Sequence, residues 1–257
     1  LRPTPMMSAL SENCIKTGTG ATKGGALYNS SGIAAIGLAD ITDSLLVIKK
    51  FVYEDKSYTL REICDAVSCN YVGHEVLRSR MMKTVPLFGS DSSQAVDMAN
   101  RVAKFVHDHF NSKSNFRGAP YTVGFWSMSN HVPFGTLTGA LPSGRLAGKP
   151  FTPGLTPEAH ASHSLLDNLK DVAKLDPVNI NNNIAFNVKV VPSAKDTHEQ
   201  VVNHLYSYAK AYCDLGGMQM QFNVVSSDTM RAAMESPDEY RDLLVRISGY
   251  NAYFVTL

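Results

Sequence analysis

The second half of the chain alternates between strand-like and helix-like stretches, and this alternation limits the folds that it can adopt. Apolar and polar side chains alternate along residues 183–192 and 218–226, as they do in half-buried strands. Stretches with helical periodicity surround them, at 163–176, 197–217 and 226–244. Because strands that alternate with helices favour a sheet with helical cover, we predict an α/β fold.

The first part of the chain is predicted to be mainly helical. Helical patterns cover residues 39–51, 57–82 and 90–113, and Ser57 or Thr59 offers an N-cap for the second of them. The third pattern is the clearest, and its apolar residues are expected to share one face: Ala95, Met98, Ala99, Val102, Phe105 and Val106. We therefore expect more helix than strand in the whole chain.

Residues 118–157 carry many glycines and prolines and are expected to form a long loop. A loop of this length inside a compact domain is usually functional or disordered. Its aromatic residues favour an ordered structure, because disordered segments contain few aromatics.

The composition is typical of a globular protein, with 44% hydrophobic and 18% charged residues. A formal net charge of +1 creates no field that would attract nucleic acid or anionic lipid, so neither partner is expected. No apolar run is long enough to cross a membrane, and the first residues lack the pattern of a signal peptide. Both ends look cut from a longer chain.

The four cysteines form neither a CxxC pair nor a metal-ligand spacing. Unpaired thiols favour a reducing, cytoplasmic setting. Cys64, Cys69 and Cys213 lie on or near predicted helices, and we expect them to be core thiols.

The motifs of common catalytic sites are missing from the sequence, which contains no G-x-S-x-G, no H-E-x-x-H and no P-loop. His160 and His163 fit a polar helix entry better than a metal site, so no metal is predicted. Residues 18–25, GTGATKGG, could cradle a phosphate, although no strand-like segment precedes them. Arg145, in LPSGRLAGKP, is either a surface arginine of a turn or half of a structural ion pair.

Gly249 interrupts the strand-like run RDLLVRISGYNAYFVTL at the C-terminus. A glycine in such a run usually marks a bulge or a turn. It can also lose a Cα hydrogen atom to give a planar radical, because the amide nitrogen donates into the radical centre and the carbonyl group withdraws from it. Such a radical needs shielding from dioxygen, which would cleave the chain. An apolar covering could come from Tyr250, Tyr253, Phe254 and Val255, and Arg246 could anchor the loop by bonding backbone carbonyls.

The stretch VRISGYNAYF resembles the glycyl radical motif of the pyruvate formate-lyase-like enzymes, in which R-V-x-G-Y/F surrounds the radical glycine. Three other stretches are similar to blocks of that family in the same order: GGALYNSSGIAAIGLADITDSLLVIKK, NHVPFGTLTGALPSGRLAGKP and GGMQMQFNV. Ile247 replaces the more usual valine. The resemblance implies that Gly249 is the radical site, with Arg246, Ser248 and Tyr250 supporting its loop.

The resemblance also implies a fold, the second half of a ten-stranded barrel with helical cover and a glycyl radical loop at the C-terminus. Residues 1–117 would form a mainly helical part of the barrel domain, and 118–240 its loop-rich and strand–helix part. Residues 241–257 would form the radical loop. The chain would then be the C-terminal portion of a catalytic subunit.

The chemistry implied by the resemblance depends on groups outside this chain. An activating enzyme with an iron–sulfur cluster and S-adenosylmethionine would take the hydrogen atom from Gly249, so the chain itself would bind no cofactor. The glycyl radical would then form a thiyl radical on a cysteine of the G-C-x-E type, which this sequence lacks. Cys14 has Lys16 where the acid would stand, and we expect it to be structural. Expected partners are the activating enzyme, the remainder of the subunit, a small-molecule substrate and further subunits of a homo- or hetero-oligomer.

The sequence leaves the reaction open. Eliminating members of the family tend to carry T-P-D-G-R and V-A-G-Y-S, where this chain has LPSGR and ISGYN. These motif sequences favour radical addition of a hydrocarbon to fumarate. Phe125, Trp126 and Met128 would then line an apolar pocket for the substrate. The alternatives are a dehydratase or lyase reaction and carbon–carbon cleavage of the formate C-acetyltransferase kind. A further alternative is a non-catalytic α/β module, in which Gly249 is an ordinary bulge.

Overall fold

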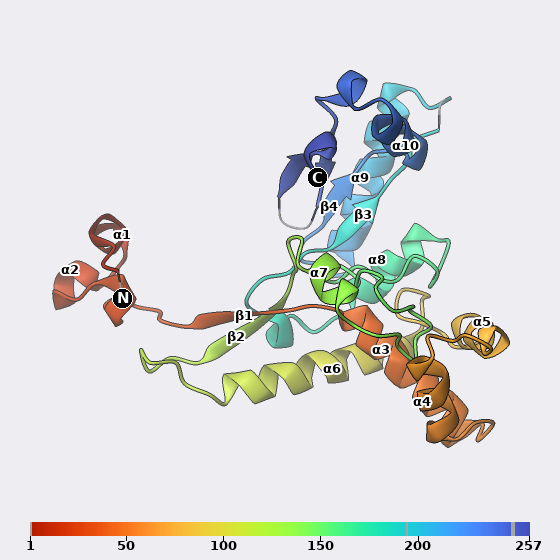
Figure 1. Ribbon diagram of the computed structural model, residues 1–257. Helices are drawn as coiled ribbons and strands as arrows, with labels where there is room; N and C mark the ends of the chain where they lie inside the picture. Colours follow the sequence, from red (N-terminus) through yellow and green to blue (C-terminus); the bar gives the residue numbers. More distant parts are fainter. Residues whose placement is uncertain (1, 194, 248–249) are drawn as a thin grey trace.

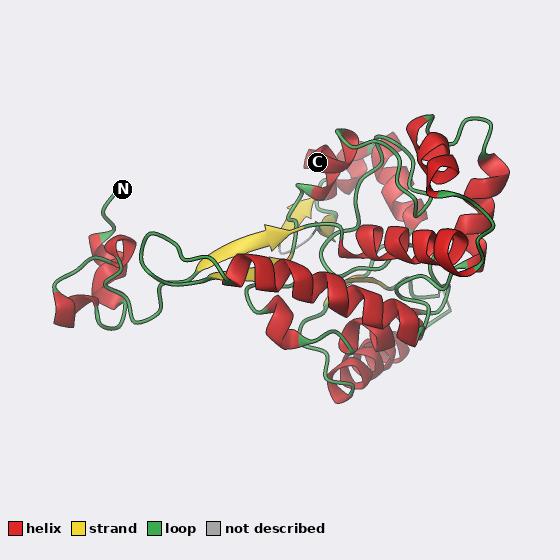
Figure 2. Ribbon diagram, turned by 90° about the horizontal axis from the view of Figure 1, so that it is seen from below, coloured by secondary structure: helices red, strands yellow, loops and turns green. Residues whose placement is uncertain are grey.

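A computed structural model describes residues 2–193, 195–247 and 250–257. The molecule is elongated, with helices α1 and α2 in a small lobe at one end (Figure 1). Strands β1 and β2 lead from that lobe into the body, and helix α6 runs alongside them. Strands β3 and β4, helices α9 and α10 and the C-terminus lie at the top of the view in Figure 1, and helices α4 and α5 lie at the lower right, away from the lobe. Figure 2 shows that helices and loops account for most of the body.

The helices of the first part and the strand within it follow the chain in this order: α1 Pro5–Leu10, α2 Cys14–Thr17, η1 Ala21–Lys23, β1 Ser31–Ala35, α3 Leu38–Ile48, η2 Lys49–Glu54, α4 Leu60–Ser68, α5 Glu75–Thr84 and α6 Ser93–Asn111. The remaining elements are β2 Tyr121–Phe125, α7 His131–Thr136, α8 Leu165–Ala173, η3 Pro177–Ile180, β3 Asn187–Lys189, α9 His198–Asp214, β4 Gln221–Asn223, α10 Ser227–Glu235, η4 Pro237–Tyr240, β5 Leu244–Arg246, β6 Asn251–Tyr253 and η5 Phe254–Thr256. The prediction of an α/β fold with more helix than strand is confirmed.

The strands pair as β1 with β2 and β3 with β4, both parallel, and β5 with β6, antiparallel. The segment before β3 joins the first two pairs. Asn182 N–H donates to the carbonyl of Val123 at 2.9 Å, and Ala185 N–H donates to that of Phe125 at 3.2 Å. The same chain then continues as β3 beside β4. One stretch, residues 182–189, is therefore bonded to β2 at its start and to β4 at its end.

Strands β1 and β2 correct two expectations. Residues 31–35 carried no strand prediction, and β2 lies inside the stretch 118–157 that was expected to be a loop. Both strands contain a glycine, which weakens a strand signal in sequence. Gly124 is needed because a Cβ atom there would lie 2.1 Å from the carbonyl oxygen of Asn183. Gly124 thus weakens the strand signal in the sequence and also allows residues 182–185 to pair with β2.

The core lies between β1–β2 and helices α3 and α6, and extends to the β3–β4 pair. The predicted face of α6 is largely confirmed, because Ala95 and Ala99 are buried and Met98, Val102 and Val106 pack against the core. Phe105 is the exception, at 74% exposed. The buried stripe includes Ala103 and His107, so its centre is shifted away from Phe105 around the helix.

The helical pattern at 57–82 forms two helices instead of one. Thr59 caps α4 in a capping box with Glu62, as one of the two predicted caps. The chain then turns through Asn70 and Tyr71, whose φ angles are 55° and 61°. The buried Tyr71 hydroxyl donates to the carbonyl of Leu141 at 2.6 Å. This long-range bond stabilises a break that helical periodicity does not reveal.

The expectation that Cys64, Cys69 and Cys213 are core thiols is wrong, because all three are exposed. Each lies on the solvent side of a helix or at its end. Cys14 is buried, as a structural cysteine should be.

Candidate functional site

The C-terminal hairpin, residues 244–253, carries the predicted radical site. Strand β5 pairs with β6 so that Leu244 lies opposite Tyr253 and Arg246 lies opposite Asn251. Across the connection, Ile247 N–H donates to the carbonyl of Tyr250 at 3.0 Å. Two short β-prone runs around a glycine are typical of a hairpin. Gly249 and Ser248 lie outside the described residues, so the hairpin is known up to the residues on either side of them.

Arg246 fixes the hairpin to the neighbouring strand β4. Its Nε donates to Oε1 of Gln221, and its Nη1 donates to Oδ1 of Asn251 at 3.2 Å. Arg246 therefore bonds side-chain amides, whereas bonds to backbone carbonyls were expected. The carbonyl of Arg246 in turn accepts from Nδ2 of Asn223 at 3.1 Å.

Gln221 and Asn187 extend this polar contact into the sheet. The two residues are register partners in β4 and β3, and Nε2 of Gln221 donates to Oδ1 of Asn187 at 2.6 Å. Gln221 is only 7% exposed. The stretch GGMQMQFNV resembles a block of the family, but its polar residues are not among the predicted site residues. The signal was present, because Gln221 and Asn223 are two apart in a strand and so face the same side.

The apolar residues around Gly249 are only partly covered within this chain. Tyr253 is 48% exposed, and Tyr250 and Phe254 are half-buried. The expected covering is thus incomplete in the described residues.

The pocket candidates lie at the end of β2 and just after it. Phe125 ends β2, is 2% exposed and belongs to the core, whereas Met128 is 44% exposed with a φ of 47°. Trp126 is half-buried, and its indole N–H is buried with no hydrogen-bond partner among the described residues. No hydrogen bond between described residues links this stretch to the C-terminal hairpin. Their role in a pocket stays a prediction.

Arg145 is the structural ion-pair partner that was one of its two interpretations. It is buried, and its guanidinium donates to the carbonyls of Gly135 at 2.6 Å, Gly139 at 2.8 Å and Lys149. Its Nε lies 4.0 Å from Oδ1 of Asp40, and Phe151 packs under the guanidinium. The arginine thus connects the loop after α7 to the first turn of α3, because it bonds carbonyls of that loop and pairs with Asp40.

Glu158 lies beside this ion pair, in a cavity of about 190 Å³ that Arg78, Lys149 and His160 also line. Burial raises the pKa of Glu158 to about 7, and the charge of Asp40 raises it further, while Arg145 opposes the rise. Burial also raises the pKa of Asp43 well above its ordinary value, although the N–H of Phe88 donates to it and opposes the rise.

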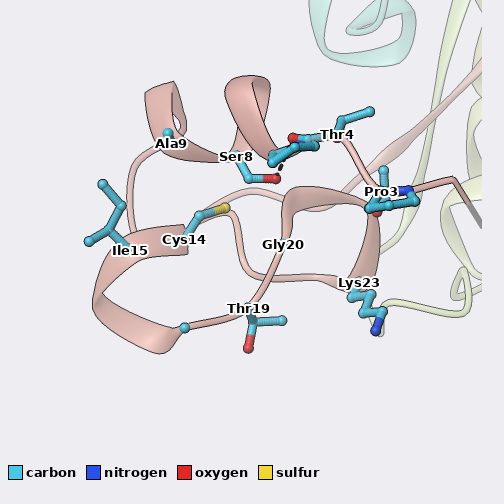
Figure 3. A pocket seen from close by; sticks show the side chains of 12 residues that line it. Pro3, Thr4, Ser8, Ala9, Cys14, Ile15, Thr19, Gly20 and Lys23 are labelled. Carbon is cyan, nitrogen blue, oxygen red and sulfur yellow. Dashed lines mark hydrogen bonds between the residues drawn. The ribbon is translucent and has the colours of Figure 1, made fainter.

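The glycine-rich stretch 18–25 lies in the N-terminal lobe, beside a cavity of about 400 Å³ (Figure 3). Cys14 lines this cavity, and Lys23 is the only charged residue among the twelve that do. The N–H groups of Gly24 and Gly25 donate to carbonyls of the same stretch, those of Ala21 and Gly20. They are not free for an anion, so the arrangement does not favour a phosphate cradle.

Within residues 2–193, 195–247 and 250–257, no three His, Cys, Asp or Glu side chains are grouped so that they could hold a metal ion. In the same part of the chain, every helix is too short or too polar to cross a membrane.

Comparison with known proteins shows to which family the chain belongs. A family model described as Pyruvate formate lyase-like matches residues 1–135, and one described as Glycine radical matches residues 151–255. The chain is 33% identical to (2S)-3-sulfopropanediol dehydratase of Klebsiella oxytoca, over 100% of this chain and 32% of that protein. It is 34% identical to isethionate sulfite-lyase of Oleidesulfovibrio alaskensis, over 86% of this chain and 27% of that protein.

A solved structure is similar over the same length. The glycerol-bound B12-independent glycerol dehydratase of Clostridium butyricum superposes with a TM-score of 0.93 at 34% identity, covering 99% of this chain and 32% of that one. The chain therefore spans about a third of the length of the relatives that it matches. With both family models matched in order, and with the predicted radical motif in a hairpin at the C-terminal end, this chain belongs to the pyruvate formate lyase-like family of glycyl radical enzymes.

Proposed function

We propose that this chain is the C-terminal portion of an anaerobic glycyl radical enzyme that eliminates water or another small leaving group from its substrate. One observation carries the proposal. The chain superposes over almost its whole length on a dehydratase, and several of its sequence relatives are dehydratases or sulfite-lyases, while one relative at 28% identity is an indoleacetate decarboxylase. These names support the alternative that the sequence left open and give no support to fumarate addition, its first interpretation.

Gly249 stores the radical in this proposal. Its place between β5 and β6 fits the physical requirement, because the strands hold its neighbours while glycine has no side chain to oppose a planar centre. Arg246, Ser248 and Tyr250 support the loop. Phe125, Trp126 and Met128 are proposed to lie near the substrate, and the unpartnered indole N–H of Trp126 would suit a polar substrate atom.

The reaction follows from radical chemistry on a substrate with a hydroxyl group next to a leaving group. A thiyl radical, on a cysteine outside this chain, takes a hydrogen atom from the carbon that bears the hydroxyl. The carbon radical then expels the leaving group from the neighbouring carbon, and the hydroxyl group loses its proton and becomes a carbonyl. The new radical takes the hydrogen atom back from the thiol, so the thiyl radical is regenerated.

The remaining parts of the proposal lie outside the chain. An activating enzyme with S-adenosylmethionine and an iron–sulfur cluster installs the radical, and the rest of the subunit supplies the cysteine and completes a ten-stranded barrel. The bonds from residues 182–189 to both β2 and β4 support that barrel, because they link the two parallel strand pairs. We propose the domain parts 1–117, 118–240 and 241–257, assembly with further subunits and a cytoplasmic setting on the same basis.

Electron paramagnetic resonance of the intact protein tests the proposal. The protein is activated anaerobically beside its Gly249→Ala variant, and each is then given 1,2-propanediol, glycerol or isethionate. We expect a glycine-centred doublet with Gly249 only, and a carbonyl product from at least one alcohol that depends on it.

Two results would contradict the proposal in different ways. Absence of the doublet, with an activator that works on a known enzyme, would return Gly249 to a structural role and favour a non-catalytic module. A doublet accompanied by consumption of fumarate and a hydrocarbon, with no carbonyl product, would restore fumarate addition.

A further inference from the structure

We infer that Gln221 and Asn223 of β4 are positioning residues that hold the C-terminal hairpin in register with the sheet, an inference that rests on the proposed role of Gly249. The two side chains contact Arg246 at two separate points. Gln221 accepts from its guanidinium, and Asn223 donates to its backbone carbonyl at 3.1 Å. We refer to Gln221, Asn223 and Arg246 as the clamp.

The clamp holds the end of β5 that leads into the connection between β5 and β6. Arg246 is the last residue of β5, and the connection that contains Gly249 begins at the next residue. A bond to a side chain alone would leave the strand free to slide, because an arginine side chain is long and flexible. The second bond, to the backbone carbonyl, fixes the strand itself. Nη1 of Arg246 then reaches Asn251 on β6, so both strands are tied to β4 through one residue.

Asn187 sets the orientation of the clamp. Its Oδ1 accepts from Nε2 of Gln221, which leaves Oε1 of Gln221 directed at Arg246. Because Gln221 is buried, water does not readily replace a lost bond. The bond to the guanidinium is charge-assisted and is therefore among the stronger hydrogen bonds. Removal of the acceptor at position 221 should consequently loosen the hairpin.

Gln219 provides a matched control. It lies two residues before Gln221, and its Oε1 accepts from the N–H of Phe186 at 3.0 Å, a bond within the β3–β4 region that does not involve the hairpin. Gln219→Met and Gln221→Met therefore each remove an amide oxygen that accepts a hydrogen bond, and Gln221→Met also removes the donor to Asn187. Gln221→Glu keeps an acceptor for Arg246, and Asn187 can turn its amide to donate to the new carboxylate.

The first measurement is hydrogen exchange on the intact, unactivated protein, followed over peptides that contain residues 244–257. We expect exchange about tenfold faster in Gln221→Met than in the wild-type protein, with Gln219→Met and Gln221→Glu close to wild type. The second measurement follows decay of the glycine doublet of the activated proteins at one low dioxygen concentration. We expect faster decay in Gln221→Met and recovery in Gln221→Glu.

The outcomes separate this inference from the proposed function. Equal exchange rates of residues 244–257 in Gln221→Met and Gln219→Met would show that the clamp does not hold the hairpin. This result does not depend on the behaviour of the radical. Faster exchange in Gln221→Met with unchanged decay of the doublet would show that the clamp holds the hairpin but does not slow the decay of the radical. A wild-type protein without a doublet overturns the proposed function itself, and is recognised because the exchange results do not depend on activation.

Discussion

Arg145 shows how one buried charge organises a loop that has little regular structure. Its guanidinium donates to the carbonyl groups of Gly135, Gly139 and Lys149, and the carbonyl of Gly135 also accepts from the N–H of Thr138 at 3.1 Å. Its charge offsets that of Asp40, whose Oδ2 is already bonded to Thr152. One side chain therefore forms hydrogen bonds to several backbone carbonyls, and loss of that side chain breaks all of these bonds together.

We expect Arg145→Met to lower the free energy of unfolding by about 3 to 5 kcal/mol, because it leaves the buried carboxylate of Asp40 without its counter-charge and the carbonyls of Gly139 and Lys149 without the guanidinium donor. Urea unfolding of the intact protein measures the change. Arg231→Met is the control, since Arg231 forms an exposed pair with Asp228 and should change stability little. A similar small effect of both substitutions would show that the loop does not depend on Arg145.

Glu158 makes stability depend on pH in a defined direction. Its pKa is about 7 in the folded protein against an ordinary value of 4.5, so the folded state holds the proton more tightly. The contribution is complete below about pH 4.5 and is lost as the pH rises through about 7, by at most about 3 kcal/mol. The charged or titratable groups around it are Asp40, Asp43, Arg78, Arg145, Lys149 and His160.

We expect Glu158→Gln to match the wild-type protein near pH 5 and to exceed it in stability near pH 8, because glutamine stays neutral throughout. Unfolding midpoints measured across this range test the sign. Since Asp43 and Asp171 also have raised pKa values, the informative quantity is the difference between the two proteins at each pH. Parallel curves for the two proteins would contradict the prediction.

At the level of elements, the sheet depends on close approach between backbones. Strand β2 lies between β1 and the segment 182–185, and Gly124 allows that segment to come near. Helices were predictable because their signals are local, namely periodicity and caps such as Thr59. Strands β1 and β2 were not, because their pairing joins residues about ninety positions apart and their glycines resemble loop residues.

We expect Gly124→Ala to destabilise the protein by about 3 kcal/mol, because the added Cβ would meet the backbone of Asn183 and the strand cannot shift without losing its pairing. Gly139→Ala is the matched control, since nothing lies within 4 Å of its added Cβ. Thermal unfolding of both variants tests the difference. Equal midpoints would mean that residues 182–185 can leave β2 at little cost.

At the level of the whole molecule, the chain has two parallel strand pairs, helices packed along them and an antiparallel hairpin near its C-terminus (Figure 1). The hairpin residues Tyr250 and Phe254 are half-buried and Tyr253 is exposed. A radical on Gly249 would therefore depend on the remainder of the enzyme for shielding from dioxygen.

We expect air to cleave the activated protein at Gly249, because dioxygen adds to a carbon-centred radical in the backbone. Mass spectrometry should find a chain shortened at this residue only after activation. The unactivated protein and Gly249→Ala should stay intact under the same exposure. Cleavage elsewhere, or in the variant, would place the radical on another residue.

The sequence by itself determined the α/β class, most of the helices and the position of the radical motif. These depend on residues that are neighbours in the chain, whose periodicity, caps and motif spacing can be seen without the fold. Only the tertiary structure decided that β1 pairs with β2, that Arg145 is buried beside Asp40 and that Gln221 holds Arg246. Each of these joins segments distant in sequence, and their energy comes from burial and hydrogen bonds that exist only once those segments meet.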